Sequence, residues 1–214
     1  MSIISPSITV ETADQYKAAV ERIQPFAQRV HIDVSDGEFA PTFLLAENQL
    51  WWPKEWQVDI HAMVARPSEH LAQLIGMKPN MIVFHAEIKE DRIALITQVK
   101  QAGIKVGIAL LRSTVPSTVA DIIKAVDHVM IFSGNLGKYG GTASLMQLEK
   151  VRLVKGINPN VEIGWDGGVS IENAYTLTQG GVDVLNTGSA LSNAPDPAEA
   201  YQLLVKEINK HGVI

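Results

Sequence analysis

The sequence has no cysteine among its 214 residues. Disulfide bonds, cysteine zinc sites and thiol catalysis are therefore excluded. No apolar run approaches the ~20 residues that a transmembrane helix needs. The first residues, MSIISPSITVETAD, lack the basic start and the long apolar stretch of a signal peptide. These absences predict a cytoplasmic protein that does not enter a membrane.

Positive charge is also scarce, with 18 Lys and Arg against 23 Asp and Glu and a formal net charge of −5. Proteins that bind nucleic acid or an anionic membrane concentrate Lys and Arg on one face. No segment here gathers them, so we expect neither partner. The sequence shows no low-complexity segment and no repeat of 20–50 residues.

What the chain does contain is a regular alternation of two kinds of segment. Hydrophobic residues make up 46% of it, enough for a full core in a single domain over residues 1–214. Short runs rich in Val and Ile read as strands at residues 3–8, 29–34, 57–64, 81–87, 105–111, 128–134, 161–168 and 182–190. Segments of helical period follow them at residues 12–23, 44–52, 67–75, 91–103, 119–126, 145–157, 173–181 and from 196 onwards. Eight such pairs favour a single-domain α/β fold, the closed (β/α)8 TIM barrel, over an open doubly wound sheet.

Two of the helix starts are marked by their residue types. Thr12 and Gln15 fit a capping box, in which each side chain accepts a hydrogen bond from the backbone of the other residue. Asp196 and Pro197 supply an N-cap and a first-turn proline.

Polar side chains fall where several of the predicted strands end. In a barrel these ends meet at one mouth, where the reactive groups of barrel enzymes lie. The residues are Ser7, His31, Asp33, His61, His85, Glu87 and Asp166.

Strand periodicity explains how two of these polar groups fit a buried strand. Side chains alternate with period two, so His31 and Asp33 point to the same side and Ile32 to the other. A buried carboxylate is costly unless it is paired, and a divalent metal would offset that cost. Together with His61 and Asp166 they form an N₂O₂ set suited to Zn²⁺, Mn²⁺, Fe²⁺ or Co²⁺. The alternative for any single histidine is a hydrogen-bonded core residue. His85 and Glu87 either orient these ligands or form an ion pair at the rim.

Glycines at the ends of the last two strands predict a phosphate site. Gly167 and Gly168 follow Asp166, and Gly188 precedes Ser189. The corresponding loops of barrel enzymes commonly bind phosphate through backbone N–H groups, although turns also need glycine.

A third glycine-rich loop follows the sixth strand. The segment SGNLGKYGGTAS, with Gly140 and Gly141, suits either a lid over the ligand or a flexible connection. Met63, two residues after His61, either faces the mouth or belongs to the core.

The motifs resemble those of the ribulose-phosphate 3-epimerase family along nearly the whole chain. They are SPSI, HIDVSDGEFAPTF, DIHAMVARP, FHAE, GIKVGIAL, the SGNLGKYGG loop, WDGGVSIENA and NTGSAL. The family hallmark is His-x-Asp on strand two, His on strand three and Asp before two glycines on strand seven.

The resemblance implies a mechanism and a set of roles. His31, Asp33, His61 and Asp166 would bind one divalent metal per subunit. Asp33 and Asp166 would be the acid/base groups on opposite faces of a ketose phosphate, exchanging the proton at C3 through a metal-stabilised enediolate. Ser7 resembles the family's strand-one serine near the base and the substrate. The family also assembles into dimers and larger oligomers, so we expect a homo-oligomer.

The chain departs from the family pattern around the pocket. Ser35 and Phe132 stand where the family has methionines, and Leu111 and Arg112 replace a polar residue and a proline. The loop from Gly134 to Gly141 has lost its usual proline. Lys138 or Arg112 contacting the phosphate is one hypothesis, and solvation of both is the alternative.

Four functions compete on this sequence. The first is C3 epimerisation between D-ribulose 5-phosphate and D-xylulose 5-phosphate, and the second is the same chemistry on a hexulose 6-phosphate. A barrel lyase or decarboxylase is disfavoured, because those sites commonly use a lysine at a strand end and none adjoins Asp33 or Asp166. A non-catalytic sugar-phosphate-binding protein would not need both carboxylates.

Overall fold

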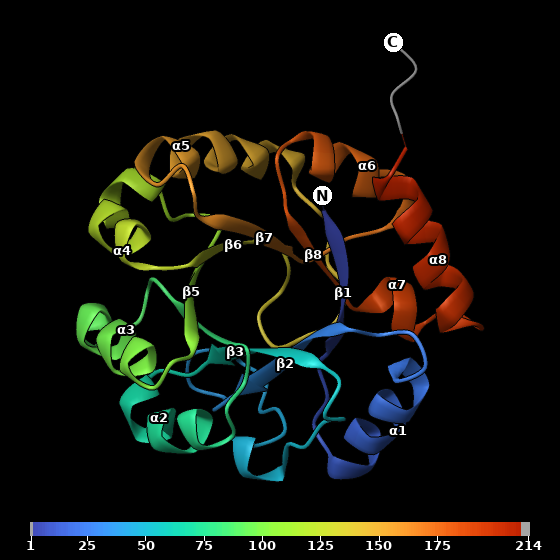
Figure 1. The fold of residues 1–214 in the computed structure, drawn as a ribbon, viewed down its shortest axis with the longest axis horizontal. Helices are drawn as coiled ribbons and strands as arrows, with labels where there is room; N and C mark the ends of the chain where they lie inside the picture. Colours follow the sequence, from blue (N-terminus) through green and yellow to red (C-terminus); the bar gives the residue numbers. More distant parts are fainter. Residues whose placement is uncertain (1, 211–214) are drawn as a thin grey trace.

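Parallel strands close into a barrel in the computed structural model of the protein, which describes residues 2–210 (Figure 1). Each strand pairs with the next in sequence, and β8 returns to pair with β1. Within the described residues the strands are β1 Ile3–Ile8, β2 Arg29–Ser35, β3 Gln57–Met63, β4 Met81–His85, β5 Lys105–Leu110, β6 His128–Phe132, β7 Glu162–Asp166 and β8 Val184–Thr187. The predicted TIM barrel is confirmed.

Helices surround the barrel on its outside (Figure 1). They are α1 Ala13–Ile23, α2 Pro67–Gly76, α3 Arg92–Gln101, α4 Ala120–Ala125, α5 Glu149–Ile157, α6 Ile171–Gln179, α7 Ser189–Ser192 and α8 Pro197–Ile208. Short 3₁₀ turns add η1 Glu47–Gln49, η2 Pro116–Val119 and η3 Leu145–Leu148. The capping box of Thr12 and Gln15 is present, and Asp196 caps α8 by accepting from two backbone N–H groups.

The helix predicted over residues 44–52 is wrong. Only η1 forms there, flanked by extended backbone at Ala46 and Leu50. The N–H of Leu44 bonds to the carbonyl of Ser35, and the N–H of Leu45 bonds to that of Val10. The segment therefore donates backbone hydrogen bonds to the last residue of β2 and to the chain just after β1. The extra helix of the barrel is instead the short α7 after β8.

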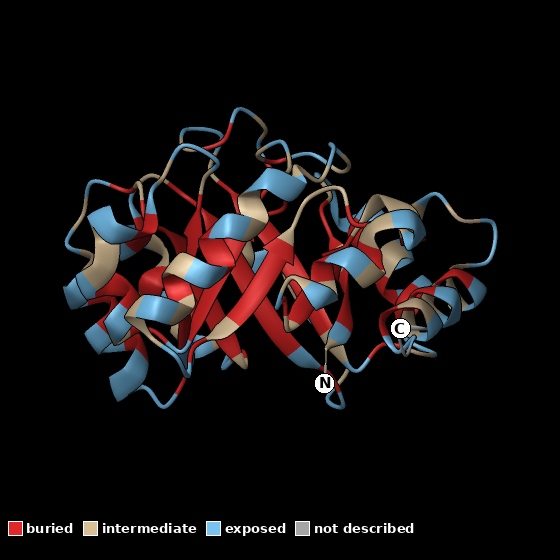
Figure 2. Cartoon of the chain, turned by 90° about the horizontal axis from the view of Figure 1, so that it is seen from above, coloured by how far each residue is buried: buried red, intermediate tan, exposed pale blue. Residues whose placement is uncertain are grey.

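The main apolar core lies between the strands and the helices. The strands are almost entirely buried, and the helices turn their exposed faces outward (Figure 2). Ile32 belongs to this outer core, as the period-two argument predicts, so His31 and Asp33 face the barrel axis.

Charged groups close the N-terminal end of the barrel, which we call the floor network. The Arg29 guanidinium donates two 2.8 Å hydrogen bonds to Glu162 and one of 2.5 Å to Asp59. His128 Nδ1 lies 2.7 Å from Glu162. A side chain at Gly164 would place its Cβ 2.3 Å from His128 Nε2, so glycine is needed for this ring to fit. Despite partial burial, these partners hold the pKa of Glu162 well below its usual range.

No helix within residues 2–210 is long and apolar enough to cross a membrane.

Candidate active site and metal centre

Strand register brings the predicted metal ligands to one place at the C-terminal end of the barrel. Asp33 on β2 stands opposite His61 on β3, and Asp166 is the last residue of β7. With His31 they each offer one ligand atom, and these four atoms lie within 4.8 Å of one another. All four side chains are largely buried, which keeps bulk water away from the cluster.

The individual distances define the atoms that face the centre. Asp33 Oδ1 lies 2.8 Å from His61 Nδ1 and 3.2 Å from His31 Nε2. Asp166 Oδ2 lies 3.9 Å from the same two nitrogens. His31 Nε2 is buried and has no hydrogen-bond partner within residues 2–210. An unpaired imidazole nitrogen beside two carboxylate oxygens fits a divalent cation, because neutral histidine and carboxylate are its usual ligands.

The two aspartates have opposite preferences for a proton. Burial and the nearby Asp33 carboxylate raise the pKa of Asp166 to about 7. Burial also acts against ionisation of Asp33, but the adjacent His31 and His61 imidazoles outweigh it and lower its pKa far below the usual range. One carboxyl group is thus held ionised, and the other is readily protonated. Two neighbouring carboxyl groups with such different pKa values are typical of an acid and a base in one site.

Behind His61 lies a second buried imidazole. His61 Nε2 is 2.8 Å from His85 Nε2, and His85 Nδ1 is 3.4 Å from Glu87. Glu87 in turn accepts hydrogen bonds from the Leu111 N–H and the Thr114 hydroxyl. Of the two sequence hypotheses, this chain of contacts favours an orienting role over a rim ion pair.

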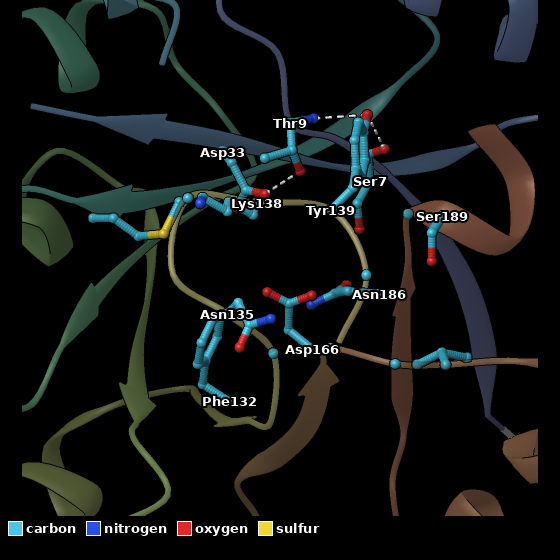
Figure 3. Close-up of a pocket in the computed structure, with 18 residues that line it drawn as sticks. Ser7, Thr9, Asp33, Phe132, Asn135, Lys138, Tyr139, Asp166, Asn186 and Ser189 are labelled. Carbon is cyan, nitrogen blue, oxygen red and sulfur yellow. Dashed lines mark hydrogen bonds between the residues drawn. The ribbon is translucent and has the colours of Figure 1, made fainter. Parts of the chain in front are cut away.

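The glycines predicted to bind phosphate surround a cavity next to this cluster (Figure 3). Its lining includes Gly140, Gly167, Gly168, Gly188 and Ser189, together with the predicted Ser7 and Met63. Gly141 instead packs against Gly134.

Two of these glycines have a further structural reason. A Cβ at Gly167 would lie 2.0 Å from the Gly134 nitrogen, and one at Gly168 would lie 2.2 Å from the Ala143 nitrogen. Both have positive φ angles, of 105° and 70°. Close contact between the loops after β6 and β7 therefore requires glycine here with or without a ligand.

The loop after β6 is fastened at both ends by Arg112. Its guanidinium donates to the carbonyl oxygens of Ser133 and Thr142, on either side of the loop. Arg112 thus holds the loop's backbone. Lys138 lines the cavity on the side of Asp33, away from Ser189 (Figure 3).

Thr9, Tyr139 and Asn186 also line the cavity, although the sequence did not single them out. Thr9 donates a 2.5 Å hydrogen bond to Asp33 Oδ2, Tyr139 contacts the β1 backbone, and Asn186 stands opposite Asp166 in the β7–β8 register. Period two could have found Thr9, two positions after Ser7, and Asn186, two before Gly188. Nothing in the sequence places Tyr139, because a loop has no periodicity.

Comparison with known proteins decides the family. The model of the ribulose-phosphate 3 epimerase family matches residues 3–192. The chain belongs to this family. "Ribulose-5-phosphate-3-epimerase, chloroplastic" of Arabidopsis thaliana is 31% identical over 94% of this chain and 75% of its own length. "Ribulose-phosphate 3-epimerase" of Schizosaccharomyces pombe is 25% identical over 97% of this chain and 94% of its own. The protein is thus a ribulose-phosphate 3-epimerase-like isomerase of sugar-phosphate metabolism.

Solved structures share the fold at low sequence identity. The crystal structure of KGPDC from Streptococcus mutans has a TM-score of 0.75 at 12% identity, covering 97% of each chain. That of 3-hexulose-6-phosphate synthase from Salmonella typhimurium has a TM-score of 0.72 at 16% identity, covering 98% of this chain and 100% of the other. Epimerase relatives are named both chloroplastic and cytoplasmic, so the cytoplasmic location of this chain stays a prediction.

Proposed function

We propose that the protein epimerises C3 of a ketose phosphate, interconverting D-ribulose 5-phosphate and D-xylulose 5-phosphate. The observation that carries this is the pair of buried carboxylates, Asp33 and Asp166, which belong to one cluster with two imidazoles and both line the cavity. Inversion at a carbon needs a base on one face and an acid on the other. Family membership supports the same reaction.

One divalent metal ion per subunit would be held by His31, Asp33, His61 and Asp166. The ligand set accepts Zn²⁺, Mn²⁺, Fe²⁺ or Co²⁺. When bound, the ion would supply Lewis-acid stabilisation of the charge that develops on the ketone oxygen beside C3. That stabilisation would make the C3 proton more acidic by several kcal/mol.

The two aspartates then divide the proton transfers. Asp33, held ionised by its histidine partners, removes the C3 proton of one epimer. Asp166, the second carboxyl group at the cavity, delivers a proton to the opposite face. In the reverse direction their roles exchange, because each ends the reaction in the protonation state that the reverse step needs.

The rest of the cavity would bind and orient the substrate. Backbone N–H groups near Gly168 and Gly188, with the Ser189 hydroxyl, would receive the phosphate. The Ser7 hydroxyl is buried without a partner in the described part of the chain, so it is free to bond a sugar oxygen. Met63 and Phe132 line the wall of the cavity.

The decisive test is exchange of the C3 proton. The metal-loaded protein is incubated with D-ribulose 5-phosphate in D₂O, and the C3 proton signal is followed by NMR. Its loss together with appearance of xylulose 5-phosphate is expected, and Asp33→Asn should abolish both. Absence of exchange with metal shown to be bound would reject the pentulose as substrate. A hexulose 6-phosphate is then tested in the same way, and failure there would favour a non-catalytic binding protein.

Metal content and assembly are measured on the same sample. Elemental analysis identifies the metal and its stoichiometry. The homo-oligomer implied by the family resemblance stays a prediction, which sedimentation equilibrium tests.

A further inference from the structure

Thr9 makes a direct contact with the carboxylate that serves as base in the proposed function. Its Oγ1 donates to Asp33 Oδ2 at 2.5 Å, and both side chains are buried. The other oxygen, Oδ1, faces His31 and His61. The two oxygens of Asp33 therefore contact different partners: Oδ1 faces the two histidines, and Oδ2 accepts from Thr9.

Thr9 is itself held by the loop after β6. The Tyr139 hydroxyl accepts a 2.8 Å hydrogen bond from the Thr9 N–H and lies 3.2 Å from the Ser7 carbonyl, to which it donates (Figure 3). Burial raises the pKa of Tyr139 to about 12, so the hydroxyl stays protonated and able to donate.

The ring of Tyr139 packs against the backbone of Gly188. A Cβ at position 188 would lie 2.6 Å from Tyr139 Cδ1, so the ring rests directly on the Gly188 backbone. Thr9 is thus connected to Asp33 through its side chain and to Tyr139 through its backbone. The hydrogen bond from Thr9 to Asp33 is therefore present together with the contact between β1 and the loop after β6.

We propose that Thr9 is a positioning residue that fixes the orientation of the Asp33 carboxylate, and that Tyr139 holds Thr9 in place when the loop after β6 is seated. The proposal rests on the proposed function for its catalytic consequence. A carboxylate oxygen has two lone pairs, so Oδ2 can accept from Thr9 and still receive the substrate proton. Fixing its rotation keeps the oxygen aligned with the reacting carbon, where small displacements lower the rate strongly.

Isosteric variants separate the hydroxyl from the packing of the side chain. Thr9→Val keeps the volume and the backbone N–H but removes the donor, and Thr9→Ser keeps the donor. Tyr139→Phe keeps the ring on Gly188 and removes its hydroxyl. Thr97→Val on the exposed face of α3 and Tyr175→Phe on α6 are matched controls away from the site.

The kinetic readout is kcat and KM for epimerisation, with metal content measured for each variant. Thr9→Val should lower kcat about tenfold with KM within about twofold, because the lost contact aligns the base and does not bind substrate. Thr9→Ser should recover most of kcat, and Tyr139→Phe should lower kcat in the same pattern but less. Unchanged kcat in Thr9→Val, or equal losses in the valine and serine variants, would overturn the proposal.

A second readout does not depend on activity. Crystal structures of the metal-loaded wild type, Thr9→Val and Thr9→Ser should show Asp33 rotated only in the valine variant. An unmoved Asp33 in Thr9→Val would overturn the proposal even if the wild type proved inactive. Wild-type inactivity with a rotated Asp33 would reject the proposed substrate and keep the positioning role.

Discussion

His61 and His85 face each other through their Nε2 atoms at 2.8 Å. Burial lowers the pKa of His61 to about 4 and also lowers that of His85, so both rings are neutral near pH 7. One Nε2 must then donate to the other. If His61 Nδ1 coordinates the proposed metal through its lone pair, its Nε2 carries the proton and His85 accepts it.

Removing this acceptor should weaken metal binding. We expect His85→Ala to raise the dissociation constant for Zn²⁺ or Mn²⁺ about 10–100-fold, because His61 loses the partner that fixes its tautomer and orientation. Competition against a chelator of known affinity measures this. His70→Ala, which removes a partly exposed histidine paired with Glu47, is the control and should leave metal affinity unchanged. If His85→Ala bound the metal as tightly as the wild type, the contact between the two histidines would be one of packing alone.

Glu162 should make stability depend on pH. Its folded-state pKa is depressed, so its stabilising contribution is complete above the unfolded value of about 4.5 and is lost as pH falls below it. Glu162→Gln should lower the free energy of unfolding by about 2 kcal/mol at pH 7, a value moderated by partial exposure. The difference in free energy of unfolding between Glu162→Gln and the wild type should become smaller below about pH 4. Urea titrations across pH measure it, with exposed Glu11→Gln as the control. A difference in unfolding free energy that does not change with pH would contradict this account.

Adding a methyl group at Gly167 should disrupt the contact between two loops. Its Cβ would lie 2.0 Å from the Gly134 nitrogen, and φ is 105°. We expect Gly167→Ala to lower stability by more than about 2 kcal/mol and to raise KM. A Cβ at Gly156 in α5 would have no neighbouring atom within 4 Å. Gly156→Ala should therefore raise the free energy of unfolding by about 0.5–1 kcal/mol. Thermal unfolding compares the two, and equal melting temperatures would refute the clash.

Releasing the ends of the loop after β6 should affect substrate binding more than chemistry. Arg112→Ala removes the guanidinium from the Ser133 and Thr142 carbonyls. We expect KM to rise about tenfold and kcat to fall less, because the loop must be ordered again at each binding event. Steady-state kinetics measure both. Arg152→Ala, a substitution at an exposed arginine paired with Glu149, is the control. A fall in kcat with KM unchanged would place Arg112 in the chemical step instead.

Strand periodicity was enough to predict much of the fold and the ligand cluster. His31 and Asp33 share one face because side chains alternate, and the barrel brings Asp166 to them from far along the chain. Segment 44–52 could not be predicted in this way, because one of its backbone partners, Val10, lies far away in the sequence, just after β1. The same holds for Tyr139, whose position depends on a tertiary contact with Thr9.

The floor network also determines how substrate and protons reach the reacting carbon. Arg29 and Glu162 span the barrel below the site, and buried Met130 and Asn186 fill the layer between. Among residues 2–210, these side chains close the base of the barrel, and the cavity beside Asp33 and Asp166 opens toward the mouth. Substrate and product must use the same entrance, so they compete for it. Under the proposed mechanism, a proton taken up by Asp33 would therefore exchange with water through the mouth, beside the loop after β6.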